Sequence, residues 1–166
     1  MPIPDAETLL NTLVEHIRPQ LTPQTALVGI RTGGAWLAER LQQALGLDTP
    51  AGSIDVSFHR DDLGSRGLPP KPQRTDIPFD VEGAHIIIID DVLYTGRTVR
   101  AAMNELFDYG RPACVELAVL VDRGGRELPI GARYCAHTLP EPLPPSQSLE
   151  LECDDKGRLL LRLTDA

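Results

Sequence analysis

The sequence predicts an α/β protein in which a central, mostly parallel sheet is flanked by helices, and three observations predict this fold class. Apolar runs of the kind that form fully buried strands occur at 26–30, 85–89 and 114–121. Segments with helical periodicity separate these runs, so strand and helix alternate along the chain. The length of 166 residues, with 42% apolar residues, suits a single domain over 1–166 with one substantial core.

The first part of the chain predicts two helices and two strands. Asp5 can cap a helix whose apolar positions between 9 and 17 fall on one face. After the buried strand at 26–30, a pair of glycines introduces a second helix over 33–45. The next run, 54–58, alternates apolar and other residues as a half-buried strand does.

The second part begins with a long loop. Residues 60–78 hold four prolines and two glycines among charges, and such a loop in a compact domain is a functional lid or is disordered. A strand over 85–89 and a helix over 96–108 follow. The tail from 149 to 163 predicts an added hairpin around a turn at 154–157.

Composition limits the classes of partner. No apolar run approaches the roughly 20 residues of a membrane span, and the first residues lack a signal peptide's pattern, so we predict a cytoplasmic protein without a membrane partner. The three cysteines include no CxxC pair, which argues against a disulfide framework or a zinc site. With a net charge of −8, an anionic partner such as RNA would have to meet a local basic patch.

The strongest chemical signal is the run from Ile86 to Thr98, IIIIDDVLYTGRT. A buried strand leads into Asp90 and Asp91, whose carboxylates can accept hydrogen bonds from two vicinal hydroxyls. The turn after them opens a helix, and helix N-termini favour phosphates because their first N–H groups lack partners. Thr95 and Thr98 add hydroxyl donors. One motif can therefore hold both ends of a ribose 5-phosphate.

Local features of this run allow two other interpretations, one of which the rest of the chain removes. Thr95 could be an ordinary helix N-cap. Asp90 and Asp91 could be the acidic pair that holds magnesium in a P-loop NTPase, but the chain contains no GxxxxGK[ST] motif, which removes that interpretation.

The same run resembles the fingerprint with which type I phosphoribosyltransferases bind 5-phosphoribosyl-1-diphosphate (PRPP). Its extended form, 90–100, resembles the version typical of the PyrR family, pyrimidine regulators with uracil phosphoribosyltransferase activity. Further PyrR-like segments occur in the same order and spacing at 57–62, 110–112 and 117–130. The resemblance covers the chain from about Ala26 to Pro140.

The resemblance implies a type I phosphoribosyltransferase fold, in which a small hood and the C-terminal hairpin occupy 122–166 and a mobile lid occupies 60–78. The implied reaction forms UMP and diphosphate from uracil and PRPP through an oxocarbenium-like state, and the lid would exclude water that could capture the anomeric carbon. Mg²⁺ carried by PRPP, near Asp90 and Asp91, would offset the charge of the leaving group, with no metal held by the protein directly.

The resemblance also assigns site residues. The implied catalytic set is Asp90, Asp91, Arg31 and Arg60, with the two carboxylates on the ribose hydroxyls. The implied 5-phosphate site is Leu93, Tyr94, Thr95, Gly96, Arg97 and Thr98, and the implied diphosphate loop is Arg31, Thr32 and Gly33. The base pocket is expected around Val121, Asp122 and Arg123, under 134–138.

The choice of base depends on Tyr94. Purine members of the superfamily usually place an acidic residue directly before the Thr-Gly pair, where this chain has Tyr94. This difference argues against a purine substrate. Uracil is itself acidic enough to need less help from a protein base.

PyrR proteins also bind the leader RNA of pyrimidine operons, and for this role Arg126 and Arg133 are the candidate contacts. Gly125 stands where the family typically has a histidine, and a basic residue is usual near Gly131. RNA affinity depends on cations that neutralise phosphates. We therefore expect weak RNA binding from this acidic chain.

Three hypotheses follow. The first is a uracil phosphoribosyltransferase with a role in regulating pyrimidine genes. The second is an RNA-binding attenuation regulator that senses UMP or UTP with little catalysis, and the third is a PRPP-dependent transferase for another base. The family resemblance also implies a homo-oligomer, a dimer or larger.

Overall fold

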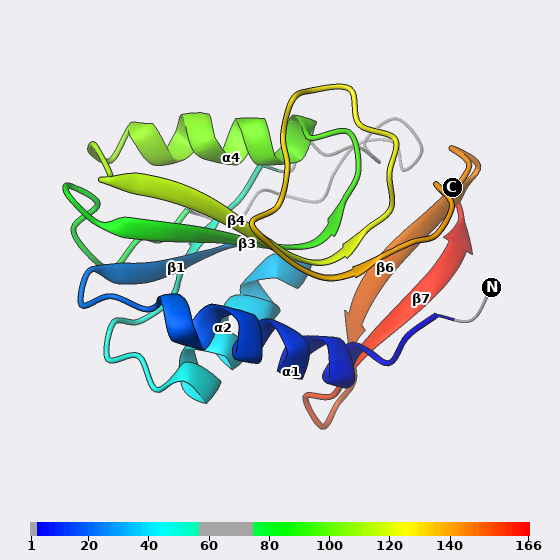
Figure 1. Cartoon of the computed structure of the whole chain (residues 1–166), viewed down its shortest axis with the longest axis horizontal. Coiled ribbons are helices and arrows are strands. Elements are labelled where there is room, and N and C mark those ends of the chain that lie inside the picture. Colours follow the sequence, from blue (N-terminus) through cyan, green and yellow to red (C-terminus); the bar gives the residue numbers. More distant parts are fainter. Residues whose placement is uncertain (1–2, 57–74) are drawn as a thin grey trace.

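A central parallel sheet with an added hairpin organises the computed structural model, which describes residues 3–56 and 75–166. The strands are β1 (Thr25–Ile30), β2 (Gly52–Ile54), β3 (His85–Leu93), β4 (Cys114–Asp122), β5 (Tyr134–Thr138), β6 (Gln147–Cys153) and β7 (Leu159–Asp165). The first five form one sheet in the order β2-β1-β3-β4-β5, and every pairing in it is parallel. The predicted fold class is confirmed (Figure 1).

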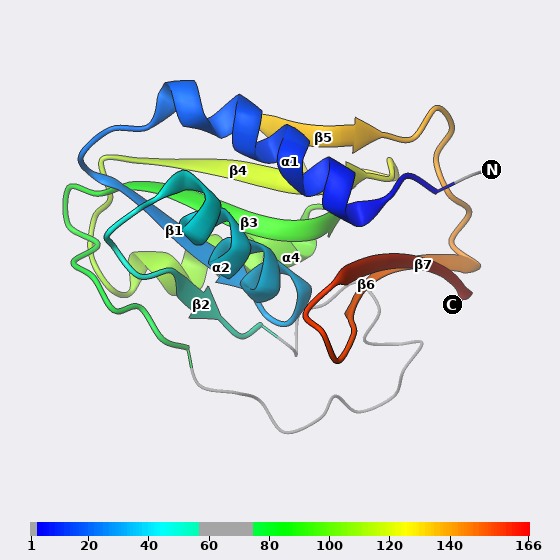
Figure 2. The ribbon, with the colours of Figure 1, turned by 90° about the horizontal axis from the view of Figure 1, so that it is seen from below.

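The helices cover both faces of this sheet. They are α1 (Ala6–Ile17), the short 3₁₀ helix η1 (Arg18–Gln20), α2 (Gly33–Leu45) and α4 (Arg97–Phe107). Helices α1 and α2 lie on one face and α4 on the other (Figure 2). Asp5 caps α1 as predicted, because its carboxylate accepts a hydrogen bond of 3.1 Å from the N–H of Thr8.

Strand β3 shows why the buried strands are apolar along their whole length. Ile87 and Ile89 pack into the core beneath α1 and α2, whereas Ile86 and Ile88 pack into the core beneath α4. Alternate side chains of a strand point to opposite faces, so a strand with helices on both sides has no solvent-facing positions. Full burial of each isoleucine contributes about 1.5–3 kcal/mol.

Two predicted strands differ from the observed ones. Strand β2 ends at Ile54, and its three residues are all buried, because β1 pairs with one edge and Asp76 bridges Ser53 at the other. The predicted alternation holds for Ile54, Asp55 and Val56, which are buried, half-buried and buried in turn, and residues 57 and 58 lie outside the described residues. Strand β3 continues past Asp90 and Asp91 to Leu93, because β4 keeps pairing with it over this stretch.

Residues 134–138 belong to the main sheet rather than to a separate hood. They form β5, which pairs with β4 at the edge of the sheet, and Tyr134 is buried in the core beneath α1. The chain reaches the hairpin only after this strand. Beyond the ends of the strands lie the segment 123–133, which packs on the turn that follows β3, and the hairpin after Thr138.

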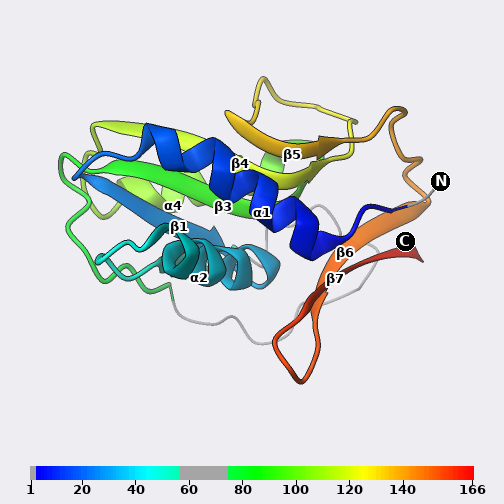
Figure 3. The same cartoon turned by 60° about the horizontal axis from the view of Figure 1, so that its bottom comes forward.

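The predicted C-terminal hairpin is present as the antiparallel pair β6–β7. It stands at the carboxyl ends of the parallel strands, with its turn near α1 and α2 (Figure 3). Glu7 and Arg40 anchor that turn: Arg40 pairs with Glu7 at 2.5 Å and donates to the carbonyl of Gly157, while Glu7 accepts the N–H of Leu159. No helix in the described ranges is long and apolar enough to cross a bilayer.

Candidate functional site

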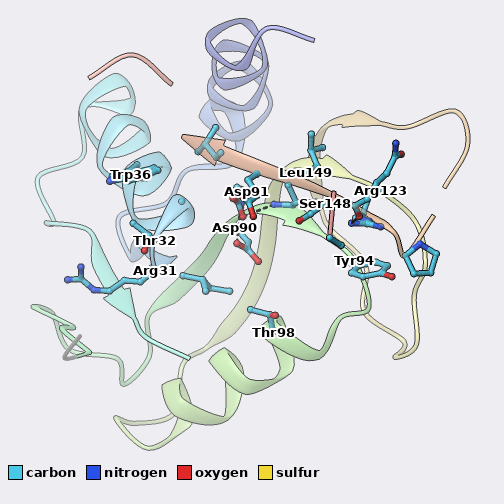
Figure 4. Close-up of a pocket in the computed structure, with 18 residues that line it drawn as sticks. Arg31, Thr32, Trp36, Asp90, Asp91, Tyr94, Thr98, Arg123, Ser148 and Leu149 are labelled. Atoms are coloured by element: carbon cyan, nitrogen blue, oxygen red, sulfur yellow. Dashed lines mark hydrogen bonds between the residues drawn. The ribbon is translucent and has the colours of Figure 1, made fainter. Parts of the chain in front are cut away.

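A cavity of about 480 Å³ opens at the carboxyl ends of β1 and β3 (Figure 4). Its wall comes from the ends of these two strands, the segments that lead into α2 and α4, Arg123 after β4, and most of β6. Ligands of parallel α/β sheets bind at this edge, and the volume lies within the range of small-molecule sites. The hairpin thus forms one wall of the site, and the ends of the sheet strands with the segments that follow them form the others.

The diphosphate loop, residues 31–33, lies between β1 and the first turn of α2, and all three residues line the cavity. The Arg31–Thr32 peptide bond is cis, and the carbonyl of Thr32 accepts the N–H groups of Ala35 and Trp36. The N-terminus of α2 therefore opens toward the cavity. A helix end of this kind favours an anion, in agreement with the predicted role.

Two glycines bring this loop against β3. A Cβ atom on Gly33 would lie 2.6 Å from Oδ2 of Asp91, and one on Gly34 would lie 2.3 Å from the carbonyl oxygen of Ile89. Any side chain at either position would push the loop away from the strand. The close approach of the diphosphate loop to the carboxylates depends on these glycines.

Asp90 and Asp91 both line the cavity, as predicted. Oδ1 of Asp90 accepts the N–H of Asp91 at 2.9 Å, and Oδ1 of Asp91 accepts the N–H of Val92 at 2.9 Å. These backbone donors orient the two carboxylates at the end of the strand. Oriented carboxylates suit a ligand with neighbouring hydroxyl groups, since each is an acceptor with several lone pairs.

The phosphate turn, residues 93–98, follows directly. Tyr94 and Thr98 line the cavity, and Gly96 takes the N-cap position of α4 with a φ of 96°. Thr95 lies one residue before this N-cap, so it is not the cap that the sequence left open; its hydroxyl accepts the N–H of Arg97 at 3.1 Å. The turn presents the start of α4 beside the carboxylates.

Other members of the predicted phosphate site have side chains that do not line the cavity. Leu93 is buried in the core beneath α4, because β3 extends further than the sequence predicted. Arg97 is half exposed and pairs with Glu127 at 2.8 Å. Its guanidinium therefore points away from the cavity wall.

Only one of the three residues predicted for the base pocket lines the cavity, namely Arg123. Val121 is fully buried in the core beneath α1, since it belongs to β4. Asp122 pairs with Arg126 at 2.6 Å. Burial would raise the pKa of the Asp122 carboxyl, but hydrogen bonds from Arg126 and from the Gly124 N–H outweigh it and hold that pKa below its ordinary value of 3.8.

Several lining residues were not found from the sequence. Trp36 lies in the first turn of α2, and Gln147, Ser148 and Leu149 belong to β6. An aromatic residue two positions after the glycine pair was a usable signal for Trp36. The β6 residues carry no local signal, because they reach the cavity only when the hairpin folds back.

The two arginines predicted to contact RNA have protein partners. Arg126 donates to the Asp122 carboxylate and, at 2.8 Å, to the carbonyl of Tyr94. Arg133 is half exposed and pairs with Glu116 at 2.5 Å. Arg60 and most of the predicted lid lie outside the described residues.

Three carboxylate residues line the cavity: Asp90 and Asp91 of β3, and Glu150 of β6. Within residues 3–56 and 75–166, no group of three histidine, cysteine, aspartate or glutamate side chains is placed to hold a metal ion.

Comparisons with known proteins agree with this geometry. Residues 3–138 match the model of the phosphoribosyl transferase domain. A curated relative in Ralstonia nicotianae, "Bifunctional protein PyrR", is 48% identical over 157 residues, which are 92% of this chain and 88% of that protein. The protein of the same name in Pseudomonas fluorescens is 46% identical over 143 residues, 84% of this chain and 85% of the relative.

Solved structures show the same architecture. A purine phosphoribosyltransferase from Pyrococcus horikoshii matches with a TM-score of 0.61 and 27% identity, covering 82% of this chain and 84% of that one. A hypoxanthine phosphoribosyltransferase from Trypanosoma cruzi, at 22% identity and a TM-score of 0.63, covers 94% of this chain and 89% of its own and shares the fold. This chain belongs to the type I phosphoribosyltransferases and, within them, to the PyrR family.

Proposed function

We propose that the protein is a uracil phosphoribosyltransferase, which forms UMP and diphosphate from uracil and PRPP. The observation that carries the proposal is the arrangement of one cavity: a phosphate turn, a pair of carboxylates and a diphosphate loop follow one another along its wall. PRPP has its parts in the same order, a 5-phosphate, two ribose hydroxyls and a diphosphate. The PyrR name of the curated relatives supports a pyrimidine base.

In the proposed complex, each feature holds one part of PRPP. Asp90 and Asp91 accept hydrogen bonds from the 2- and 3-hydroxyls of the ribose, and the start of α4 with Thr98 binds the 5-phosphate. The diphosphate loop and the N-terminus of α2 bind the leaving group. Holding the sugar at both ends fixes the anomeric carbon, which lowers the entropy cost of reaction.

The reaction exchanges one bond at that carbon. A uracil nitrogen bonds to the anomeric carbon while the bond to the diphosphate oxygen breaks, and the proton that the nitrogen loses passes to the departing diphosphate or to water. Negative charge grows on the departing diphosphate, and the Arg31 side chain and the α2 N-terminus lie on that side to stabilise it. We assign Arg60 the same role, as a further positive group on the lid.

The residues present fit Mg²⁺ bound through PRPP. Asp90 and Asp91 line the cavity beside the diphosphate loop, and magnesium commonly takes one or two carboxylates together with substrate phosphates and water. When bound, the ion would neutralise the charge of the diphosphate and so improve it as a leaving group. Asp90 and Asp91 are the side chains that would approach it.

Tyr94 favours uracil over a purine. Its ring lines the cavity next to the phosphate turn, where an acidic residue would assist a purine base. A phenol is a poor proton acceptor at neutral pH, so the base must supply its own acidity. Uracil is itself acidic enough to need less help from a protein base.

The test is a measurement of product formation. Purified protein is mixed with PRPP, Mg²⁺ and uracil, orotate or hypoxanthine, and the nucleotide formed is quantified. We expect UMP from uracil alone, and a loss of at least about 10²-fold when Asp90→Asn and Asp91→Asn are combined, because the sugar is then held poorly. Asp155→Asn, in the exposed hairpin turn, is the matched control and should retain wild-type activity.

Other outcomes favour the alternatives. Product from another base would identify a PRPP-dependent transferase of different specificity. No product with any base, from a folded protein that binds UMP, would contradict the enzyme and favour a nucleotide-sensing regulator.

A further inference from the structure

Three segments that are distant in the chain meet at the Arg123 side chain. Its Cζ atom lies 3.8 Å from the centroid of the Tyr94 ring (Figure 4). Its guanidinium also donates to the carbonyl oxygen of Gln147 at 3.0 Å and to that of Pro144 at 3.2 Å. One side chain thus connects the phosphate turn with the start of β6.

Arg123 is nearly inaccessible to solvent, with 4% of its surface exposed. A buried guanidinium is retained when its donors meet acceptors, and its planar fork can meet several at once while it stacks on an aromatic face. The N–H of Arg123 donates to the carbonyl of Leu93, so the backbone is fixed as well. The side chain therefore has a defined position from which it can orient its neighbours.

Tyr94 is also held by Gly125 and Arg126, which follow Arg123 in the chain. A Cβ atom on Gly125 would lie 2.5 Å from Cε1 of Tyr94, so the ring edge packs directly on the glycine backbone. The Tyr94 carbonyl accepts a hydrogen bond from Arg126. With Arg123 over its face, the ring has little freedom to turn into or out of the cavity.

These groups border one part of the cavity. Tyr94, Arg123 and Gln147 all line it, as do Asp90 and Asp91. In the proposed complex, PRPP occupies the phosphate turn, the carboxylates and the diphosphate loop. The base must then lie beside the anomeric carbon, in the remaining part between Tyr94 and β6.

We propose that Arg123 is a positioning residue, which holds the Tyr94 ring and the start of β6 as the two walls between which the base binds. This inference rests on the proposed function and adds how its base site is shaped. The carboxylates, the diphosphate loop and the start of α4 are held by contacts other than those of Arg123. We therefore expect Arg123 to affect the base and to leave PRPP binding nearly unchanged.

The test compares Arg123→Lys and Arg123→Met in steady-state kinetics with uracil and PRPP varied separately. We expect the KM for uracil to rise about tenfold for lysine, which keeps the charge but lacks the fork, and further for methionine. The KM for PRPP should stay within about twofold of wild type. Arg133→Met, which removes an arginine paired with Glu116 away from the cavity, is the matched control.

A second readout does not depend on turnover. Trp36 is the only tryptophan in the sequence and lines the cavity, so its fluorescence reports UMP binding directly. The Arg123 variants should bind UMP more weakly than the Arg133 variant does. Melting temperatures of all variants separate this effect from loss of fold, and Arg123→Lys remains informative if the methionine variant fails to fold.

A double-mutant cycle tests whether Arg123 acts through Tyr94. Tyr94→Leu and Arg123→Met should together raise the KM for uracil by less than the product of their separate effects, because both remove the same wall. Equal increases in both KM values, or effects that multiply, would overturn the inference.

The outcomes separate this inference from the proposed function. If the wild type forms UMP and the Arg123 variants do so with an unchanged KM for uracil, only the role of Arg123 is wrong. If the wild type neither forms nor binds UMP, the proposed function is wrong and this inference with it.

Discussion

Gly125 illustrates how much of the site depends on single residues. It has a φ of 81°, which residues with a side chain rarely adopt, and its backbone lies against the Tyr94 ring. The sequence shows only that Gly125 replaces the histidine typical of the family. The structure adds that the Tyr94 ring of this chain lies where a side chain on residue 125 would be placed.

A matched pair of substitutions separates the effect of the left-handed backbone from the effect of the contact with the Tyr94 ring. Gly125→Ala and Gly157→Ala both place alanine at a φ of 81°, but only Gly125 faces a ring, whereas nothing lies within 4 Å of a Cβ on Gly157. We expect Gly157→Ala to lower the free energy of unfolding by about 1–2 kcal/mol, the cost of the left-handed backbone. Gly125→Ala should cost about 1–3 kcal/mol more, as in overpacked cores, and should raise the KM for uracil.

Chemical denaturation measures the first quantity and steady-state kinetics the second. Equal losses of stability in the two variants, with an unchanged KM, would show that the contact between Gly125 and Tyr94 has no consequence. In that case the contacts that hold Tyr94 would be those with Arg123 and Arg126.

At the scale of elements, the contact that holds the hairpin in place lies between its turn and helices α1 and α2. The hairpin supplies β6 to the cavity, and its turn is held by Glu7 of α1 and Arg40 of α2. Glu7 accepts hydrogen bonds from Arg40 and from the N–H of Leu159. Three elements thus depend on one carboxylate.

This contact predicts a pH dependence of stability. The hydrogen bond from Arg40 is the main cause that lowers the pKa of Glu7 below its ordinary value of 4.5, against the opposing effect of burial. A carboxyl whose pKa is lower in the folded state stabilises the fold above its unfolded pKa, and the stabilisation is lost as the pH falls through the folded pKa. The window therefore begins near pH 4.5 and extends downward.

Glu7→Gln should lower the melting temperature at pH 7 by about 2–4 °C, which corresponds to about 1 kcal/mol for a partly exposed pair. Below pH 4 the variant and the wild type should converge. Glu152→Gln is the control, because Glu152 pairs with Arg162 inside the hairpin at 3.4 Å and with neither helix. A difference that stays constant between pH 7 and pH 3 would contradict the role assigned to the Glu7 carboxylate.

At the scale of the whole molecule, charge limits the second function associated with the family. The chain has a net charge of −8, and the two candidate RNA contacts, Arg126 and Arg133, pair with Asp122 and Glu116. An arginine that is already paired must break a contact before it can neutralise a phosphate. This observation supports the weak RNA binding expected from the sequence.

We predict that pyrimidine leader RNA binds no more tightly than non-specific complexes do, with a Kd of about 10⁻⁶–10⁻⁴ M at physiological salt. Fluorescence anisotropy with labelled leader RNA, at two salt concentrations, measures this affinity. A scrambled RNA of the same length and composition is the control. A submicromolar Kd for the leader RNA alone would show that a specific RNA site exists despite the charge.

Several expectations about the whole molecule stay predictions. They are the single domain over 1–166, the lid over 60–78 with Arg60, and a dimer or larger oligomer. Sedimentation of the purified protein would decide the last of these.

The sequence by itself determined the parallel sheet, the carboxylates with their phosphate turn, the diphosphate loop and the hairpin. Each of these is written in residues that are close together in the chain: the periodicity of apolar side chains, a glycine pair after a strand, or two acidic residues at a strand end. The run from Ile86 to Thr98, which resembles the PRPP fingerprint, is contained in thirteen successive residues. Such patterns act through local geometry, so they can be interpreted before the chain is folded.

Only the tertiary structure decided which side chains enclose the cavity. Arg123 meets Tyr94 and Gln147, and Ser148 reaches the cavity from a hairpin that begins after the last strand of the sheet. Leu93 was predicted for the site but is buried, because pairing between β3 and β4 continues further than expected; Val121, also predicted for the site, is buried within the strand that was expected over 114–121. These outcomes depend on contacts between residues tens of positions apart, for which no short pattern of residues gives a signal.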